Sequence, residues 1–231
     1  GIHFYSAETS FKVQEGLSDP LAPTITSSPA SVVLTGSQSS VSWSPNHPDL
    51  TAQLSAQVKI DSSTYSVSGS VTTYKIPSSV MRSVGSHTIS VRTQNALNQS
   101  WGPWSSTVTF QVRDLPSLVV SSPTNGYVLT DLPLIVTWDA SDVTGISQQT
   151  VEILNSLGST VLQTSVPVGT MNLAIGRDQY YLESGQAYSV RVTVTNGVNL
   201  SSFVTVPFTV LYVGPPNPEV TIKQGAGCSM S

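Results

Sequence analysis

The chain has 231 residues and a net charge of −4, and only 10% of its residues are charged while 39% are hydrophobic. It has no basic run of the kind that nucleic-acid binders carry, and no apolar run approaches the ~20 residues of a membrane span. We therefore expect no nucleic-acid partner and no membrane insertion. The single cysteine, Cys228, excludes an antibody-type domain built around an inter-sheet disulfide.

The first predicted element is a strand within residues 1–13, whose segment FKV resembles parts of two later segments. These are TVTFQV at 107–112 and TVPFTV at 205–210, so one strand recurs at intervals of about 98 residues. The recurrence predicts a tandem array. Its predicted parts are 1–22, a flanking strand and linker of a preceding unit; 23–113, the first domain; 114–213, the second domain; and 214–231, the start of a following unit. Prolines in the short joints predict a semi-rigid array.

Within the first domain, a strand around Trp43 is followed by strands in which apolar and polar residues alternate. A period of two predicts strands with one face in a core and the other in water. The predicted core-facing positions of two of these strands are Leu54, Ala56, Val58 and Ile60, and His87, Ile89 and Val91.

The second domain repeats this pattern, with Trp138 at the position of Trp43. Its strand over 187–196 corresponds to 86–95, and its predicted core-facing positions are Tyr188, Val190, Val192 and Val194. Each domain has roughly seven such runs, separated by clusters of Ser, Gly, Asn and Pro. The pattern predicts an all-β fold of two tandem seven-stranded, two-sheet sandwiches.

The order of these features resembles the fibronectin type III family. The shared features are a tryptophan in the second strand, an L-x-x-G-x-x-Y-x-V-x-V run, and a Gly-Pro-Trp-Ser loop before a final F-x-V strand. The resemblance covers both domains. It implies that Trp43 and Trp138 lie in the cores and that the Tyr188 hydroxyl bonds to backbone a few residues upstream. In the first domain His87 stands at the tyrosine position and Met81 at the leucine position, so the imidazole is the candidate to replace the phenol.

No catalytic constellation is recognisable. The histidines His3, His47 and His87 are far apart in the sequence, and there is no HxxxH, CxxC, glycine-rich phosphate loop or G-x-S-x-G. We therefore expect no enzyme activity, no catalytic residues, no metal site and no cofactor. Asp139 and Asp142 form the nearest acidic pair, which we interpret as a solvated turn in preference to a cation site. We interpret His87 as a hydrogen-bonded residue at the core edge, with a pH sensor as the alternative.

The loop NALNQSWGPWS at 95–105 carries the one pronounced aromatic cluster, Trp101 and Trp104, which are the candidate ligand-binding residues. It resembles the W-S-x-W-S signature of cytokine receptors, but the paired cysteines and the run of strand arginines of that family are missing. Trp104 is expected to pack at the start of the last strand. Trp101 has no counterpart in the second domain, and two interpretations stay open. The ring offers a stacking face to a sugar or to an aromatic ring of a partner, or it folds back over the sheet edge or over Arg92, where it would make a cation–π contact.

Charge-poor, Ser/Thr-rich arrays without disulfides resemble phage and prophage tail proteins and bacterial surface proteins. We expect a non-catalytic structural and adhesive module of a host-facing phage or prophage tail protein, located on a virion or at a cell surface. The alternative is an accessory spacer or carbohydrate-binding module of a secreted bacterial enzyme or surface adhesin. The expected partners are neighbouring repeats of the same chain, tail proteins and host cell-wall glycan.

Overall fold

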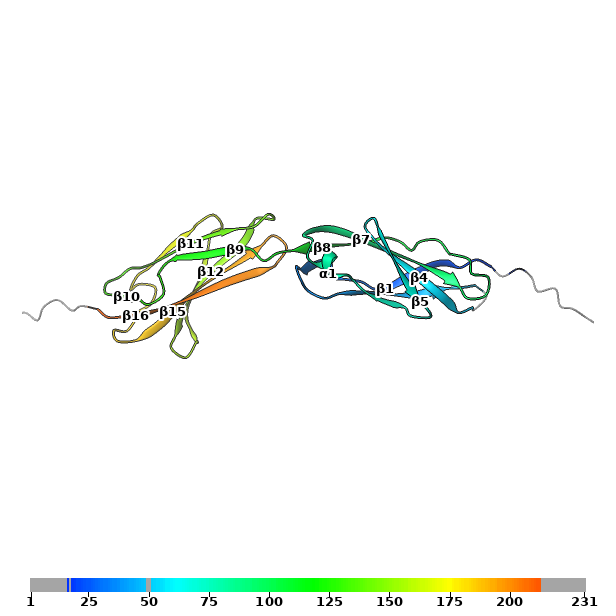
Figure 1. The fold of residues 1–231 in the computed structure, drawn as a ribbon. Coiled ribbons are helices and arrows are strands. Elements are labelled where there is room, and N and C mark those ends of the chain that lie inside the picture. Colours follow the sequence, from blue (N-terminus) through cyan, green and yellow to red (C-terminus); the bar gives the residue numbers. More distant parts are fainter. Residues whose placement is uncertain (1–15, 17, 49–50, 213–231) are drawn as a thin grey trace, which may run out of the picture. The chain divides into compact units, whose positions relative to one another are not determined.

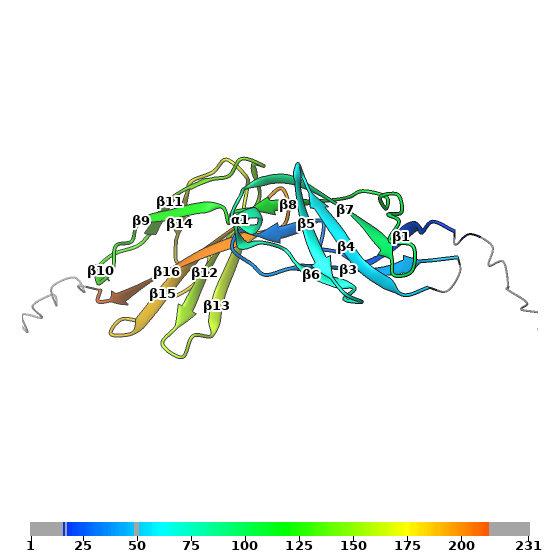
Figure 2. The same cartoon turned by 45° about the vertical axis from the view of Figure 1, so that its right-hand side comes forward.

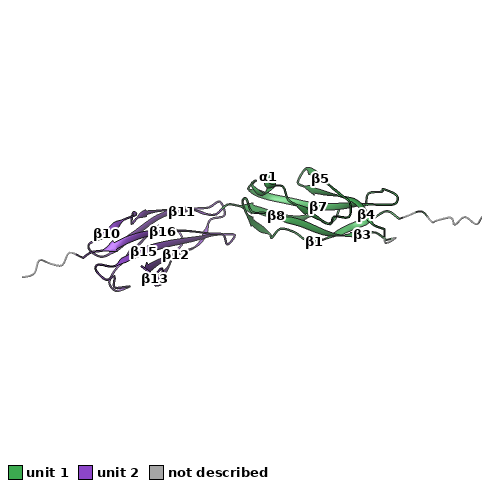
Figure 3. Cartoon of the chain, turned by 60° about the horizontal axis from the view of Figure 1, so that its bottom comes forward, with its two compact units in different colours: residues 1–114 green, residues 115–231 purple. Residues whose placement is uncertain are grey.

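A computed structural model describes residues 16, 18–48 and 51–212 (Figure 1). The expectations for residues 1–13, His3, 214–231 and Cys228 lie outside the described residues. The chain divides into two compact domains between Asp114 and Leu115 (Figure 3), and each is described by itself.

The described residues of the first domain form eight strands and one short helix. They are β1 (Leu21–Ser27), β2 (Val32–Leu34), β3 (Ser40–Asn46), β4 (Gln53–Ile60), β5 (Ser63–Ser68), β6 (Thr73–Lys75), α1 (Ser78–Met81), β7 (Gly85–Asn95) and β8 (Val108–Arg113). The helical turn α1, labelled in Figure 2, was not predicted. It places Met81 in the core, at the position that the family resemblance assigns to a leucine.

In the second domain, residues 115–212 form eight strands. They are β9 (Ser117–Ser122), β10 (Tyr127–Leu129), β11 (Leu134–Ser141), β12 (Ile146–Asn155), β13 (Thr160–Val166), β14 (Asn172–Ile175), β15 (Ala187–Asn196) and β16 (Ser201–Val210).

Each domain packs a three-stranded sheet against a five-stranded sheet. The orders are β1-β3-β6 and β2-β8-β7-β4-β5 in the first domain, and β14-β11-β9 and β10-β16-β15-β12-β13 in the second. The pairs β2–β8 and β10–β16 are parallel, and the other pairs are antiparallel. The two domains have the same strand order, so the predicted repeat is confirmed. The fold is all-β, with two tandem sandwiches that resemble fibronectin type III modules.

The first predicted strand of each domain is divided between the two sheets. In the first domain β1 ends at Ser27 in the smaller sheet, and β2 begins at Val32 in the larger one. In the second domain β9 and β10 divide in the same way around Pro123. Because proline has no N–H to donate to a ladder, it favours an interruption at such a point. Each sandwich therefore has eight strand segments where seven were predicted.

The two cores are built alike around the predicted tryptophans. Trp43 and Trp138 are buried, and so are Phe110 and Phe208 of the recurring strand. Predicted core positions that are also buried are Ala56, Val58, Ile60, His87, Ile89, Val91, Tyr188, Val190, Val192 and Val194. Period-two alternation thus predicted these positions correctly.

One predicted core position is wrong. Leu54 is 39% exposed, and its neighbour Gln53 is buried instead. The pairing of β4 with β7 shifts register between Gln53 and Ser55, so the strict alternation of inward and outward side chains is interrupted there. Gln53 takes the inward position because its side chain has a partner in the core.

That partner is the core tryptophan, and the arrangement occurs in both domains. The indole N–H of Trp43 donates to Gln53 Oε1 at 3.0 Å, and the indole N–H of Trp138 donates to Gln149 Oε1 at 2.8 Å. The amide nitrogen of Gln149 donates to two backbone carbonyls, at 3.1 and 3.0 Å, and that of Gln53 does the same at 3.0 and 2.8 Å. Each buried amide therefore ties the indole to the loop that follows the fifth strand segment of its domain.

Candidate functional site

Arg92 lies on the outer face of the five-stranded sheet of the first domain. Its neighbours on β7, Val91 and Thr93, are buried, so Arg92 points away from the core. The residue opposite on β4 is Gln57, and the Arg92 Nε and Nη2 both donate to Gln57 Oε1, at 2.9 and 2.7 Å. These two bonds fix the plane of the guanidinium.

The loop after β7 brings both candidate tryptophans to this guanidinium. The backbone N–H of Ser105 donates to the Val91 carbonyl at 2.7 Å, and the N–H of Val91 donates to the Ser105 hydroxyl at 3.0 Å. The segment that carries the rings is thus fixed along β7. The guanidinium carbon of Arg92 lies 5.0 Å from the ring centroid of Trp101 and 4.7 Å from that of Trp104.

We call Trp101, Arg92 and Trp104 the tryptophan–arginine stack. Each cation–π contact of this kind contributes about 0.5–1 kcal/mol at an exposed site. One interpretation of Trp101 required its ring to fold back over Arg92, and this contact is present. The guanidinium of Arg92 contacts both indole rings. Both rings are half-buried, so part of each remains accessible, and their use as a sugar-binding surface stays a prediction.

The loop is also held at Gly102, between the two rings. A Cβ at this position would lie 2.7 Å from the carbonyl oxygen of Pro20 and 2.9 Å from the Pro20 Cβ. Only glycine fits there without a shift of backbone. The Gly102 N–H donates to the Thr93 carbonyl at 2.9 Å, which fixes the loop on its other side.

The second domain has a counterpart of the arginine without the tryptophans. Arg191 on β15 faces Glu152 on β12, and its Nη1 lies 3.4 Å from Glu152 Oε2. Its guanidinium carbon lies 5.9 Å from the ring centroid of Phe203, which is 67% exposed. The cation is therefore paired with a carboxylate and has one open ring beside it, where the first domain has an amide and two rings.

The tyrosine corner of the second domain confirms the prediction made from the family resemblance. Tyr188 is buried, and its hydroxyl oxygen accepts a hydrogen bond from the backbone N–H of Glu183 at 3.2 Å. The ring stacks on Phe208 with 5.9 Å between centroids. The phenol thus ties β15 to the loop that precedes it.

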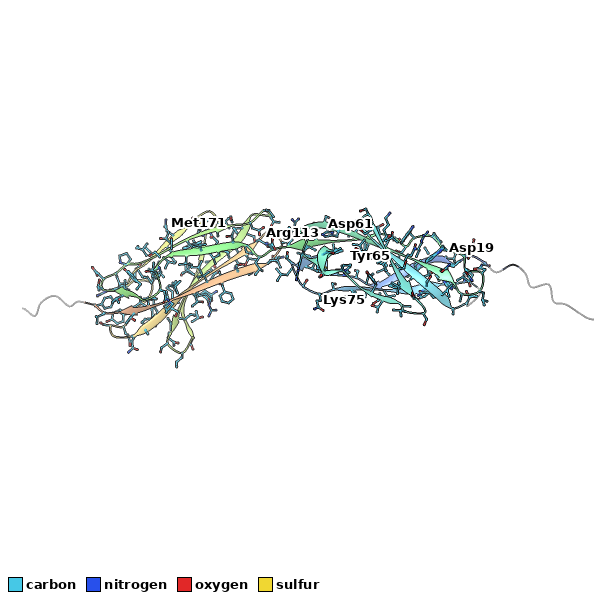
Figure 4. All side chains as sticks on the ribbon, in the orientation of Figure 1. Asp19, Asp61, Tyr65, Lys75, Arg113 and Met171 are labelled. Atoms are coloured by element: carbon cyan, nitrogen blue, oxygen red, sulfur yellow. The ribbon has the colours of Figure 1, made fainter. Side chains whose placement is uncertain are left out.

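In the first domain the imidazole of His87 replaces the phenol and gains a further partner. Its Nε2 lies 2.7 Å from the Ser83 carbonyl oxygen, and its Nδ1 lies 2.7 Å from Asp61 Oδ2. The ring packs on Phe110 with 5.4 Å between centroids. Asp61, labelled in Figure 4, comes from the turn between β4 and β5.

His87 and Asp61 each shift the pKa of the other. Burial alone would lower the pKa of His87, but the hydrogen bonds to Asp61 and to the Ser83 carbonyl, with the charge of Asp61, raise the pKa above its usual value. Burial alone would raise the pKa of Asp61, but the hydrogen bonds from His87 and Thr88, with the charge of His87, lower the pKa. Both shifts favour the ionised pair.

Two of the remaining chemical candidates, Asp142 and His47, have structural partners. Asp142 Oδ1 accepts from the Thr144 N–H at 2.7 Å and from its hydroxyl at 2.6 Å, and Oδ2 accepts from Asn196 Nδ2 at 3.2 Å. His47 follows β3 and is buried, with its Nδ1 3.0 Å from the Thr51 carbonyl oxygen and its Nε2 3.2 Å from the Thr93 hydroxyl oxygen. Asp139 is exposed on β11.

Within residues 16, 18–48 and 51–212, no group of three or more His, Cys, Asp or Glu side chains is placed to hold a metal ion. No helix in the same part of the chain is long and apolar enough to cross a membrane.

Comparisons with known proteins show resemblance at the level of structure. No family model matches the sequence, and no curated protein matches it. The fibronectin(III)-like modules of Clostridium thermocellum CbhA match with 16% identity and a TM-score of 0.44, over 82% of this chain and 94% of that one. A segment of two fibronectin type III domains from chicken tenascin matches with 14% identity and a TM-score of 0.36, over 83% of this chain and 99% of that one. The fold assignment rests on the strand order, and these resemblances carry no statement about function.

Proposed function

We propose that this pair of domains is a non-catalytic structural module that connects neighbouring parts of a longer chain. The observation that supports it is the parallel pairing of the N-terminal strand segment with the last strand, β2 with β8 and β10 with β16. Because these strands run in the same direction, the chain enters each sandwich at one end and leaves it at the opposite end. Domains of this kind extend a chain when they are repeated.

The same pairing suits a module that bears tension. In the first domain the Gln111 N–H donates to the Ser31 carbonyl and the Thr35 N–H donates to the Arg113 carbonyl, both at 2.9 Å. Tension on the chain acts along these strands and loads their hydrogen bonds in shear, so that several bonds must break together. In the second domain the N–H of Leu211, the residue after β16, donates to the Leu129 carbonyl of β10 at 2.8 Å.

Single-molecule stretching of the whole chain tests this proposal. We expect two unfolding events, each releasing about 30 nm of chain for roughly 90–100 residues at about 3.4 Å per residue. Thr35→Pro removes one donor of the β2–β8 pairing and should lower the force of one event while leaving the other unchanged. Extension without distinct events would overturn the proposal, and equal forces in the variant and the wild type would overturn the assigned load path.

We propose the host-facing part of a phage or prophage tail protein as the setting, with tail proteins and host cell-wall glycan as partners and a virion location. The low charge, the Ser/Thr-rich composition and the single cysteine support it. The alternative setting is a secreted bacterial enzyme or surface adhesin in which these domains are accessory modules. The sequence of the full-length parent distinguishes them, because tail-assembly or coiled-coil regions indicate the first setting and a catalytic domain or cell-wall anchor the second.

A second candidate function is adhesion through the tryptophan–arginine stack. It is favoured by the two half-buried rings of the stack. Because the guanidinium of Arg92 already holds both rings in place, they lose little conformational entropy when a ligand stacks on them. A screen of cell-wall glycans with the wild type and with Trp101→Ala tests it, and Phe203→Ala in the second domain serves as the matched control. Adhesion predicts binding that Trp101→Ala alone abolishes. If the wild type binds no glycan, the adhesive role is excluded and the structural role remains.

A further inference from the structure

Three elements of the first domain meet at His87. The ring stands on β7, the carboxylate of Asp61 comes from the turn between β4 and β5, and the carbonyl of Ser83 comes from the loop after α1. We refer to residues 77–85, which contain α1, as the α1 corner. We propose that His87, Asp61 and Ser83 form a pH-dependent lock on the α1 corner, closed while the imidazole is doubly protonated and opened when it loses one proton.

The proposal rests on which of the groups around His87 can donate a hydrogen bond and which can only accept one. A backbone carbonyl and an ionised carboxylate only accept hydrogen bonds, so both nitrogens of His87 must donate, and only the imidazolium has two N–H groups. Neutral His87 keeps one N–H. Its other nitrogen then turns a lone pair toward an oxygen atom 2.7 Å away, whichever tautomer it adopts. Deprotonation therefore removes one of the two bonds and leaves a repulsive contact in its place.

The positive charge of the His87 imidazolium has one counter-ion among the described residues. From β8 the ring meets Phe110, which does not titrate, and from the loop after α1 it meets an uncharged carbonyl. Asp61 is the charged group that acts on His87 among the described residues. The Thr88 N–H holds Asp61 Oδ1 at 2.9 Å, so the carboxylate stays in position when the ring loses its proton.

The lock controls a segment that joins several parts of the domain. The α1 corner carries Met81 into the core, and the Met81 carbonyl accepts a hydrogen bond from the Gly36 N–H at 2.7 Å. The residue before Gly36, Thr35, donates to the carbonyl of Arg113, the last residue of β8. Opening of the α1 corner therefore affects the end of β8, from which the chain leaves the first domain.

The pKa directions fix the pH window. The pKa of His87 is raised in the folded state, so its stabilisation is complete below the usual histidine range and is lost as pH rises through the folded value. The pKa of Asp61 is lowered, so its contribution is lost as pH falls through the folded value. The lock is closed between these limits. In the second domain the corner is formed by the Tyr188 hydroxyl and the backbone N–H of Glu183, with no imidazole or carboxylate in the hydrogen bond.

Hydrogen exchange on the full chain tests the lock, with peptides from 77–86 and, as an internal reference, from 176–186. After correction for the intrinsic pH dependence of exchange, opening of the α1 corner should increase by up to about tenfold per pH unit above the usual histidine pKa, until the folded value is passed. The reference corner should stay constant. His87→Tyr, which introduces the residue of the second domain, should abolish the pH dependence of the first corner.

A second measurement keeps the test independent of how that variant folds. The nitrogen chemical shifts of His87 in the wild type should report a doubly protonated ring with a titration midpoint above the usual histidine value, and Asp61→Asn should move the midpoint down. A wild-type midpoint at or below the usual value overturns the proposal. So does equal pH dependence in both corners, or pH dependence that persists in folded His87→Tyr.

Discussion

The two domains close the same corner of the same sandwich with different chemistry. In the second domain the Tyr188 hydroxyl accepts one hydrogen bond from backbone, and in the first domain the His87 imidazole donates to backbone and to Asp61. Both rings pack on the phenylalanine of the last strand. The fold therefore requires a ring that ties strand to loop, and leaves the direction of the hydrogen bond free. The imidazole of His87 adds a charge to its corner and makes the hydrogen bonding of that corner depend on pH.

A similar contrast holds on the outer faces of the two sheets. Both domains place an arginine on the strand before the last, opposite a hydrogen-bond acceptor on the neighbouring strand. The longer loop of the first domain covers Arg92 with two indoles, whereas the second domain leaves Phe203 open beside Arg191. Loop length thus decides whether two aromatic rings or one lie beside this cation.

Removal of the core tryptophan should have the largest effect, and the same effect in both domains. Trp138→Ala should destabilise the second domain by about 3–5 kcal/mol, and Trp43→Ala should do so in the first, because each leaves a large cavity. Denaturant unfolding followed by residue-resolved hydrogen exchange measures each domain separately. In each variant the untouched domain is the control. An unchanged second domain in Trp138→Ala would mean that the strand register is wrong.

Loss of the buried glutamine should rank second. Gln149→Leu leaves the indole N–H of Trp138 and the Thr170 carbonyl without the partner that Gln149 supplies, at about 1–3 kcal/mol for each buried group that stays unsatisfied. The Pro167 carbonyl keeps the hydrogen bond from the Thr170 N–H at 3.1 Å. We expect the second domain to lose at least about 2 kcal/mol. Gln148→Leu, one residue earlier and exposed, is the matched control and should change stability by less than about 0.5 kcal/mol. Equal effects of the two variants would contradict the role of Gln149.

The corner hydroxyl should have a smaller effect than the core residues. Tyr188→Phe removes the acceptor of the Glu183 N–H and keeps the ring, so the second domain should lose about 1 kcal/mol. Tyr181→Phe removes an exposed hydroxyl and should have no measurable effect. Thermal unfolding of the two variants in the same buffer is sufficient, and equal midpoints would show that the corner bond contributes nothing.

The outer-face rings should show the smallest effects and a difference between domains. Trp101→Ala should destabilise the first domain by about 0.5–1 kcal/mol through the lost contact with Arg92. Phe203→Ala should change the second domain by no more than about 0.5 kcal/mol, because the ring is largely in solvent. If both substitutions prove neutral, the stack does not stabilise the first domain.

Much of the fold could be predicted because its signals are local. Period-two alternation identified the buried positions of β7 and β15, and the repeat located both core tryptophans. Leu54 was misplaced because a register shift beside it depends on pairing with a distant strand, which alternation does not encode. The buried glutamines were missed for a related reason. The sequence signal was present, since a glutamine follows each core tryptophan by ten or eleven residues, but glutamine alone reads as a surface residue.

The candidate site was predicted in part. The sequence identified Trp101, Trp104 and the possible contact with Arg92, because a tryptophan pair in a loop after an arginine-bearing strand is a conspicuous pattern. It also placed His87 at the tyrosine position. It did not indicate Asp61 as the partner of His87, because that carboxylate comes from a turn 26 residues earlier and meets the ring only when β4 pairs with β7.

The different corners also bear on how neighbouring repeats avoid exchanging strands while they fold. Tandem domains of similar sequence are prone to such misassembly. If β7 paired within the second domain, His87 would face the turn after β12, where Asn155 already accepts hydrogen bonds from the backbone N–H groups of Leu157 and Ser159. A buried imidazolium would then lack its carboxylate, which is costly. The loss of the Asp61 contact would thus disfavour such a swapped pairing of β7.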